Sequence, residues 1–268
     1  MRRAGSEPAG TTPAPGDLLD PGALNVALDQ ARPEAVLHLA AEIATQRDAS
    51  RIEQVNVGGT RLLLDACRAH GEPRVVFVST VVTGDAHGEL LDEGSILLVH
   101  TAYGRSKQRG EELIRESGLP SVIIRPSHVY GAGGWYASEI VGRLRQPGRF
   151  AVVGAGRNLW DVVHAVDVAG ACVDAAERAP AGSVYHVVDD EPISFYDFVA
   201  LTAVALSLGA PRKVPAWLAR LATGADPVRA VVRSARSSNA RIKQELGWRP
   251  QFPTAREGVP DAVAGLEG

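Results

Sequence analysis

The first half of the chain alternates between short apolar runs and longer segments whose apolar residues recur with helical spacing. The short runs, such as VVFVS at 75–79, are apolar at almost every position. Runs of this kind fit strands that are buried on both faces of a parallel sheet. We therefore expect strands at 35–40, 75–79 and 121–125, and helices at 21–31, 52–70 and 101–117. This alternation predicts an α/β fold with a doubly wound parallel sheet.

The alternation weakens after about residue 132, and the remaining elements are shorter. The pattern predicts strands near 150–153 and 184–188, and helices near 137–145, 194–208, 215–223 and 240–246. We interpret residues 1–131 as the core of the sheet, to which 159–190 returns in part. Residues 132–268 then form mainly a smaller and less regular C-terminal lobe.

Tyr103 and Lys107 lie four positions apart in a predicted helix, so their side chains share one face, one turn apart. A free tyrosine has a pKa of about 10, which is too high for efficient proton exchange at neutral pH. A nearby ammonium group favours the phenolate and lowers that pKa. The pair is therefore a candidate acid/base for a substrate hydroxyl or carbonyl. By itself the spacing is weak evidence, because two amphipathic residues on a surface helix give the same pattern.

Ser79 adds context to this pair, because it ends the strand expected at 75–79. In open parallel sheets, ligands bind at the carboxyl ends of the strands. A hydroxyl at that edge can donate a hydrogen bond to a reacting oxygen and stabilise its developing charge. The alternative interpretation is a serine in an ordinary turn.

Eight motifs along the chain, in the right order, resemble those of the extended short-chain dehydrogenases/reductases, also called the NAD-dependent epimerase/dehydratase family. The resemblance runs from about residue 16 to residue 263 and is far more specific than any single motif. The motifs are GDLLD at 16–20, LHLAA at 37–41, NVGGT at 56–60, STVVTG at 79–84, YGRSK at 103–107, RPSHVYG at 125–131, LWDVVHAVDVA at 159–169 and ELGWRP at 245–250. One position departs from the family pattern, because Thr83 stands where the family usually has tyrosine.

The resemblance implies a Rossmann-like dinucleotide-binding core, a substrate-binding lobe, and NAD or NADP as the cofactor. It implies that Tyr103 is the general acid/base, that Lys107 lowers the pKa of Tyr103 and binds the nicotinamide ribose, and that Ser79 orients the substrate oxygen. The other implied cofactor contacts are Asp17, Leu18, Ala40, Ala41, Asn56, Pro126 and His128. The implied substrate contacts are Thr80, His128 and Trp160.

Three residues near these motifs also have simpler interpretations. Asp17 could cap a helix, and Pro126 could be a rigid turn. His38 could be a core histidine whose hydrogen bonds are satisfied, and for this residue we favour the simpler interpretation.

The family's N-terminal strand–glycine turn–helix unit has no counterpart in this sequence, which holds no Gly-x-x-Gly-x-x-Gly motif. In that motif, glycines let the backbone approach the pyrophosphate at a helix N-terminus. We therefore expect an N-terminally incomplete sheet. Either the chain is a truncated or mis-started form of an active enzyme, or it is a natural remnant that no longer binds dinucleotide. Arg2 and Arg3 stand where the family selects its cofactor, and arginines favour the 2′-phosphate of NADP.

Trp160 bears on the substrate class. Nucleotide-sugar relatives often carry an arginine in this place, ahead of the aspartate that is Asp161 here, and it clamps the diphosphate. Trp160 instead offers apolar area and one donor. The Thr-Asp-Glu triplet of nucleotide-sugar 4,6-dehydratases is also absent after Val78. We therefore favour hydride transfer on a less charged carbonyl or alcohol. A nucleotide-sugar epimerase or dehydratase is one alternative, and a non-catalytic remnant or binding module is another.

The composition narrows the expected partners. The net charge of −3 leaves no basic surplus for nucleic acid. Cys67 and Cys172 lie far apart and outside any metal-binding cluster, so we expect neither a disulfide framework nor a metal site. No apolar run approaches the about 18 residues that would cross a bilayer, and no apolar stretch follows the N-terminal arginines as in a signal peptide. We expect a cytoplasmic protein with a small-molecule substrate, without nucleic acid or membrane as a partner, and with a homodimer left open.

Overall fold

The structure describes residues 9–43, 45–82, 89–96, 99–146, 148, 150–223 and 234–266, without the side chains of 220–223. In this computed structural model, the main sheet has four parallel strands in the order β1-β2-β4-β9. The strands are β1 (Ala35–His38), β2 (Arg74–Val78), β4 (Ser121–Pro126) and β9 (Val184–Val187). The three strands expected in the first half are therefore adjacent, and the strand expected at 184–188 joins them.

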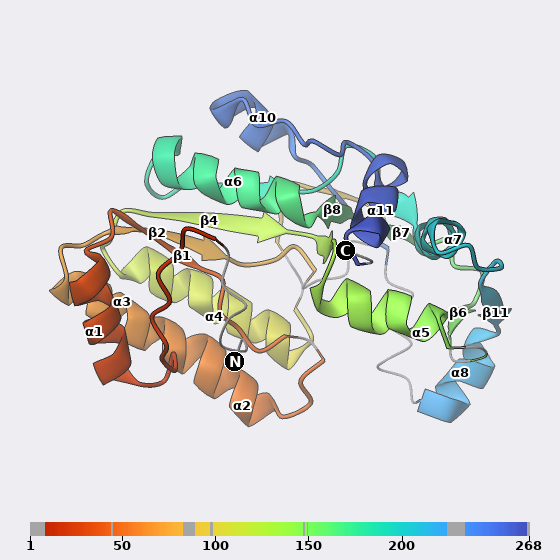
Figure 1. The fold of residues 1–268 in the computed structure, drawn as a ribbon, viewed down its shortest axis with the longest axis horizontal. Coiled ribbons are helices and arrows are strands. Elements are labelled where there is room, and N and C mark those ends of the chain that lie inside the picture. The colour runs from red at the N-terminus through yellow and green to blue at the C-terminus, as the bar shows by residue number, and fades with distance from the viewer. Residues whose placement is uncertain are drawn as a thin grey trace.

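Helices cover both faces of this sheet, as Figure 1 shows. One face holds α1 (Pro21–Ala31), α3 (Gly59–Ala69) and α4 (Ala102–Glu116), and the other holds α6 (Ala165–Arg178) and α10 (Ala240–Leu246). Side chains along β2 alternate between the two layers, since Val76 packs with Cys172, whereas Phe77 packs with Leu64 and Ile114. The predicted α/β fold with a doubly wound parallel sheet is confirmed.

A π-helical turn interrupts the helix expected at 52–70. The segment α2 (Ala49–Glu53) leads into the π-helix η1 (Gln54–Gly58), and α3 follows without a break. Asp48 caps α2, because its Oδ1 accepts hydrogen bonds from the N–H groups of Ser50 and Arg51 at 2.9 and 3.2 Å. Turns of this type are rare and are often found at functional sites, and this one carries Asn56.

A smaller lobe, which includes residues 90–91 and 128–130 as well as later segments, is built from short strand pairs and helices beside the carboxyl edge of the main sheet (Figure 1). The pairs are β5 (His128–Tyr130) with β8 (Val162–His164), β7 (Leu159–Trp160) with β10 (Ile193–Ser194), β6 (Ala151–Val153) with β11 (Arg212–Val214), and β3 (Leu90–Leu91) with β12 (Arg236–Ser237). The helices are η2 (Tyr136–Val141), α5 (Gly142–Leu144), α7 (Phe195–Ala205), α8 (Ala216–Thr223) and α11 (Ala255–Ala264). Aromatic residues such as Tyr130, Tyr136 and Phe198 fill the core of this lobe. The helix α11 was not expected from the sequence pattern.

Residues 9–34 hold turns and α1, and no strand. The helix α1 starts after Asp20, whose Oδ1 accepts hydrogen bonds from the N–H groups of Gly22 and Ala23. Within the described residues, β1 is therefore an edge strand of the main sheet. Arg2 and Arg3, on which the preference for NADP depends, lie outside the described residues, as does Thr83.

Three further findings concern membrane-spanning helices, metal sites and disulfides, none of which the sequence predicted. In the parts of the chain that the structure describes, no helix has both the length and the apolarity to cross a membrane. The same residues hold no cluster of metal-ligating side chains. Cys67 and Cys172 are buried free thiols, and burial raises the pKa of each to about 11, so neither is a reactive thiolate at neutral pH.

Candidate active site

Tyr103 and Lys107 lie in the first two turns of α4, at the carboxyl edge of the main sheet. Thr101 sets the start of this helix, because its Oγ1 accepts a hydrogen bond from the N–H of Gly104 at 3.0 Å. Tyr103 is half-buried, and Lys107 is 4% exposed. The Lys107 ammonium lies over Phe77 of β2, with Nζ 4.4 Å from the ring centroid. The helix is thus anchored with its lysine against the sheet.

Burial shifts the pKa of both residues. It raises the pKa of Tyr103 to about 12 and lowers the pKa of Lys107 to about 8, although the Glu111 carboxylate opposes the shift at Lys107. The direction for Tyr103 is opposite to the lowering that we expected from Lys107. The reason is that the phenol loses water on burial, which disfavours the charged phenolate.

Ser79 follows the last residue of β2 and is 4% exposed. Its N–H donates to the carbonyl of Ile124 at 2.7 Å, and its hydroxyl hydrogen-bonds the carboxylate of Glu111. That carboxylate also accepts two hydrogen bonds from Arg125, from Nε at 2.8 Å and from Nη2 at 2.7 Å. Burial raises the pKa of Glu111, but these hydrogen bonds outweigh it and hold the pKa below its usual value. Ser79 is therefore fixed by a buried ion pair that joins β4 to α4.

Asn56 connects the segment after β1 to the helix that carries Tyr103. Its Oδ1 accepts a hydrogen bond from the Glu42 N–H at 2.7 Å, and its Nδ2 donates to the Glu42 carbonyl at 2.9 Å. Nδ2 also donates to Ser106 Oγ at 2.9 Å, and that hydroxyl donates to the Tyr103 carbonyl at 2.8 Å. These hydrogen-bond partners of the Asn56 side chain are all protein groups. The role that the structure supports for Asn56 is therefore to position the backbone around the site.

His38 is a core histidine, as we favoured. Its Nε2 donates to Thr60 Oγ1 at 2.8 Å, because that hydroxyl in turn donates to the Asn56 carbonyl at 2.6 Å. Burial first, and the charge of Lys107 second, lower the pKa of His38 to about 3. The imidazole is therefore neutral over the whole physiological range.

Two candidate cofactor contacts precede α1. The Asp17 carboxylate accepts a hydrogen bond from the N–H of Leu19 at 2.9 Å, so it stabilises a turn, and Asp20 is the residue that caps the helix. Leu18 packs against the first residue of α3, Gly59. A β-carbon on Gly59 would lie 2.6 Å from Leu18 Cδ2, so a larger residue here would displace the Leu18 side chain. This contact holds the 17–18 turn beside the start of α3.

The remaining candidates follow the ends of β1 and β4. Ala40 is exposed and Ala41 half-exposed, and they are the second and third residues after β1. Pro126 is the last residue of β4 and is buried, and its carbonyl accepts the Val81 N–H at 3.0 Å. Pro126 therefore continues the sheet and is not a turn. These residues share the carboxyl edge with Ser79.

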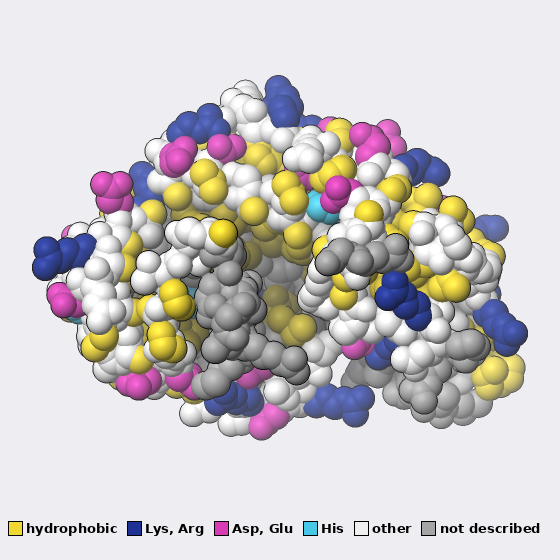
Figure 2. Space-filling model, in the orientation of Figure 1, with side chains coloured by type: hydrophobic (Ala, Val, Ile, Leu, Met, Phe, Trp, Pro, Cys, Tyr) yellow, Lys and Arg dark blue, Asp and Glu magenta, His cyan; other side chains and the backbone are white. Residues whose placement is uncertain are grey.

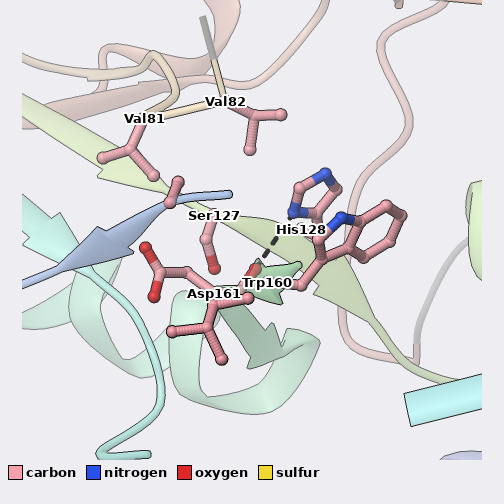
Figure 3. A pocket seen from close by; sticks show the side chains of 8 residues that line it. Val81, Val82, Ser127, His128, Trp160 and Asp161 are labelled. Carbon is pink, nitrogen blue, oxygen red and sulfur yellow. Dashed lines mark hydrogen bonds between the residues drawn. The ribbon is translucent and has the colours of Figure 1, made fainter. Parts of the chain in front are cut away.

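His128 and Trp160 are in direct contact, with parallel rings 4.0 Å apart at the centroids and an angle of 4° between them. His128 Nδ1 hydrogen-bonds the carbonyl of Asp161 at 3.0 Å, which fixes the imidazole on the indole. Thr80, the third candidate substrate contact, is buried, and its Oγ1 accepts the N–H of Val82 at 2.9 Å. This bond shapes the turn that brings Val82 opposite His128 (Figure 3).

A pocket lies between these elements, at the carboxyl edge of the sheet. Figure 2 shows that the molecule is hollowed between the half with the main sheet and the half with the lobe, and apolar side chains lie in this hollow. The pocket residues are Val81, Val82, Ser127, His128, Leu159, Trp160, Asp161 and Ala235. None of these residues is a lysine or an arginine. Ligands of doubly wound sheets bind at this edge, so the pocket is the candidate substrate site.

Sequence reasoning named His128, Trp160 and Asp161, and of the polar residues that line the pocket it missed Ser127. The available signal was its position, since Ser127 directly follows a strand that is buried at every residue. Glu111 was also missed. It lies four residues after Lys107, on the same face of α4, and this spacing could have identified it.

Comparison with known proteins gives a consistent result. Residues 2–188 match the family model described as NAD dependent epimerase/dehydratase. A Streptomyces protein named 3-diazoavenalumate denitrifying reductase is 29% identical, over 97% of this chain and 89% of its own length.

Two solved structures have the same fold. RMD from Pseudomonas aeruginosa, complexed with NADPH, superposes with a TM-score of 0.76 at 25% identity, covering 96% of this chain and 89% of its own. UDP-glucose 4-epimerase from Thermus thermophilus, in complex with NAD, gives a TM-score of 0.83 at 24% identity, covering 99% of this chain and 88% of its own. The second match concerns the fold alone.

Proposed function

The chain belongs to the NAD-dependent epimerase/dehydratase family of enzymes, and on this premise we propose that it is an NAD(P)-dependent oxidoreductase acting on an uncharged carbonyl or alcohol. The observation that carries this proposal is the position of Tyr103 one turn from the buried Lys107, at the sheet edge where Ser79 follows β2. The name of the Streptomyces relative, a reductase, supports the same reaction class.

The proposed reaction assigns one task to each of three residues. The bound dinucleotide supplies or accepts the hydride. Tyr103 delivers a proton to the substrate oxygen during reduction and takes it back during oxidation. Because burial raises the pKa of Tyr103 to about 12, its phenolate needs a cation, and Lys107 is assigned to that task and to the nicotinamide ribose. Ser79 is assigned to orient the substrate oxygen. Its hydroxyl has one proton, so it must leave the Glu111 carboxylate in order to donate to that oxygen.

The described residues fit the nicotinamide end of a dinucleotide better than its pyrophosphate. Lys107 offers a buried cation, and the small side chains of Ala40 and Ala41 leave the end of β1 open. The N-terminus of α1 does not offer an anion site, because the Asp20 carboxylate already accepts its first N–H groups. We propose a nicotinamide dinucleotide as cofactor, with the preference for NADP resting on Arg2 and Arg3.

The pocket lining supports an uncharged substrate over a nucleotide sugar. No described lining residue is cationic, and the Asp161 side chain at the pocket would repel a diphosphate. A nucleotide-sugar epimerase is the second candidate, which the family description favours. We further propose a cytoplasmic enzyme with a small-molecule substrate, and sedimentation of the purified chain would decide between monomer and homodimer.

Isotope transfer tests the proposal directly. NADPH and NADH carrying deuterium at C4 would be incubated with uncharged aldehydes and ketones and with the protein, extended upstream by a strand–glycine turn–helix unit. We expect deuterium on the carbinol carbon of the product alcohol. Conversion of UDP-glucose to UDP-galactose without net oxidation of the cofactor would support the epimerase instead. Tight dinucleotide binding with neither reaction would contradict both and leave a binding module.

A further inference from the structure

Glu111 connects two residues of the candidate active site. It lies one turn after Lys107 on α4, so the two side chains share one face of the helix, and each residue is 4% exposed. The Glu111 carboxylate also accepts a hydrogen bond from the Ser79 hydroxyl at the end of β2. One buried acid is therefore close to two of the three residues to which we assign the reaction.

The position of the Glu111 carboxylate is fixed by its hydrogen bonds. Arg125 donates to it from Nε and Nη2 at 2.8 and 2.7 Å, and Arg115 donates from Nη2 at 2.8 Å. The Arg125 side chain is buried with it, whereas the Arg115 side chain is 50% exposed. Together with the Lys107 ammonium, three cations surround this one carboxylate. If Glu111 lost its charge, Lys107 and Arg125 would be two buried cations without a counter-charge in this cluster.

Lys107 needs a counter-charge because it is buried. Loss of hydration favours the neutral amine of a buried lysine over its ammonium. Burial accordingly lowers the pKa of Lys107 to about 8, and the charge of Glu111 is the effect that opposes it. The Phe77 ring below Nζ attracts a cation through its quadrupole, but it carries no net charge.

The other titratable groups packed around Lys107 supply no negative charge. On α4, burial raises the pKa of Tyr103 to about 12, so its phenol is neutral. On β1, burial lowers the pKa of His38 to about 3, so its imidazole is neutral, and on β4 the nearest group is the Arg125 cation. The segment η1 carries no charged side chain. The remaining charges on the packed elements are at the amino end of β2 or on the exposed and half-exposed sides of α2 and α3, namely Arg74, Arg51, Glu53, Arg61, Asp65 and Arg68.

We propose that Glu111 is a positioning residue for Lys107, whose carboxylate, held in place by Arg125 and Ser79, is the counter-charge that keeps the buried ammonium charged beside the site. This role rests on the proposed oxidoreductase function, in which the Lys107 ammonium acts on Tyr103 and on the nicotinamide ribose. Glu111 acts only through Lys107, and it transfers neither a proton nor a hydride.

The test titrates Lys107 directly in the 268-residue chain, without cofactor or substrate. The sequence holds three lysines, Lys107, Lys213 and Lys243, so lysine that carries carbon-13 at Cε gives three NMR signals. Lys213→Arg and Lys243→Arg assign two of them, because each variant loses one signal. Glu111→Gln keeps the shape of the side chain and removes its charge. In this variant the pKa of Lys107 should fall by about 1 pH unit or more relative to the unmodified protein.

Two further variants separate the charge of Glu111 from its size. Glu112→Gln is the matched control, because Glu112 is the next residue, is exposed and pairs with Arg109, so it should leave the pKa of Lys107 unchanged. Glu111→Asp keeps the charge, so the pKa of Lys107 should stay closer to that of the unmodified protein than in Glu111→Gln.

A second background covers the case in which Glu111→Gln folds poorly because Arg125 loses its partner. In an Arg125→Gln protein, the additional change Glu111→Gln leaves no buried guanidinium unpaired. The pKa of Lys107 should again be lower in the double variant than in Arg125→Gln alone.

Turnover gives an independent measurement in the chain extended upstream. The loss of kcat/KM for the dinucleotide at alkaline pH should move to lower pH in Glu111→Gln, by the same amount as the pKa of Lys107, and should not move in Glu112→Gln. A role of Glu111 in folding alone would lower the melting temperature without moving either the NMR titration or the pH profile.

The same pKa of Lys107 with and without the charge of Glu111 would overturn the proposal, as would an equal fall in Glu112→Gln. These outcomes are separable from those of the proposed function. Hydride transfer that depends on Tyr103, with an unchanged pKa of Lys107 in Glu111→Gln, would refute only the role of Glu111. The expected fall of that pKa in a protein that transfers no hydride would refute only the oxidoreductase.

Discussion

The side chain of Asn56 donates a hydrogen bond to Ser106 Oγ across 2.9 Å, although the two residues are 50 positions apart in the sequence. Because Asn56 also binds both backbone groups of Glu42, one amide joins the segment after β1 to α4. The position of Tyr103 relative to the end of β1 therefore depends on a single buried side chain.

Replacement of Asn56 by alanine should lower the free energy of unfolding by about 2 kcal/mol, because it leaves partly buried backbone groups of Glu42 and the buried Ser106 hydroxyl without this partner. Urea denaturation measures this change. Asn25→Ala is the control, since Asn25 is exposed and should have little effect. Combining Asn56→Ala with Ser106→Ala should cost less than the sum of the two single changes, and full additivity would show that the bond between them contributes nothing.

The 268-residue chain should bind NAD and NADP poorly. Residues 9–34 hold no strand–glycine turn–helix unit, and the Asp20 carboxylate accepts the first N–H groups of α1. Losing several charge-assisted hydrogen bonds of about 1.5–3 kcal/mol each weakens binding by orders of magnitude. Calorimetric titration measures the affinity before and after a strand–glycine turn–helix unit is joined upstream of Met1. Micromolar binding by the chain without that unit would prove the expectation wrong.

In the extended chain, Tyr103→Phe should lower turnover by about 100-fold or more, because the substrate oxygen loses its proton donor. The measurement is the initial rate of NAD(P)H oxidation with a reducible carbonyl. Tyr196→Phe is the matched control, since Tyr196 lies under Lys213 in the lobe and its ring face is kept. Equal rates for the two variants would exclude Tyr103 as the acid/base.

Turnover should fall as the pH rises through about 8. Burial lowers the pKa of Lys107 to about 8, so its ammonium is present below that pH and is lost above it. The pH profile of kcat/KM for the dinucleotide reports this group in the free enzyme. A profile that stays level to pH 9.5 would mean that the charge of Lys107 is not required.

Asp189 should make the protein less stable at alkaline pH. Burial first and the nearby Asp167 second raise the pKa of Asp189 to about 8, and its carboxyl group accepts a hydrogen bond from Tyr130 at 3.4 Å. The folded state therefore holds a proton that the unfolded state loses near pH 4, so stability declines as the pH rises toward 8.

Asp189→Asn mimics the protonated acid and should reduce this decline. Between pH 5 and pH 8.5, the unfolding free energy of the variant should fall less than that of the unmodified protein, by on the order of 3 kcal/mol. Chemical denaturation at both values measures the difference. Asp174→Asn, which removes a surface ion pair with Arg178, should leave the pH dependence unchanged. Parallel pH curves for Asp189→Asn and the unmodified protein would argue against a protonated Asp189.

The helices and strands that were predicted well from the sequence are those whose local residue pattern favours the same structure as their packing in the fold. The helix at 240–246 ends where Gly247 adopts φ of +65°, a conformation that favours glycine, so its end could be read from the sequence. By contrast, strands such as Leu159–Trp160 have only two residues and form through their partner strand, so no local pattern marks them.

The sequence located the strand end and the helix that carry the candidate site residues, but not how those residues interact with their surroundings. The positions of Ser79 and Lys107 followed from strand ends and helical spacing. The raised pKa of Tyr103 did not, because burial depends on the packing of the whole domain. The π-helical turn with Asn56 was also beyond sequence reasoning, since one additional residue in a helical turn leaves no periodic signature.

The six residues of β4 are all buried, whereas β1, at the edge of the described sheet, has three of its four residues partly exposed or exposed. Stability is therefore graded across the sheet, and amide hydrogen exchange should be slowest in β4 and faster toward β1. Arg125 and Pro126 end the most protected strand, and Ser127 directly follows it. A local opening that frees the β1 edge, where the dinucleotide is expected, would leave the Ser127 side of the candidate substrate pocket folded.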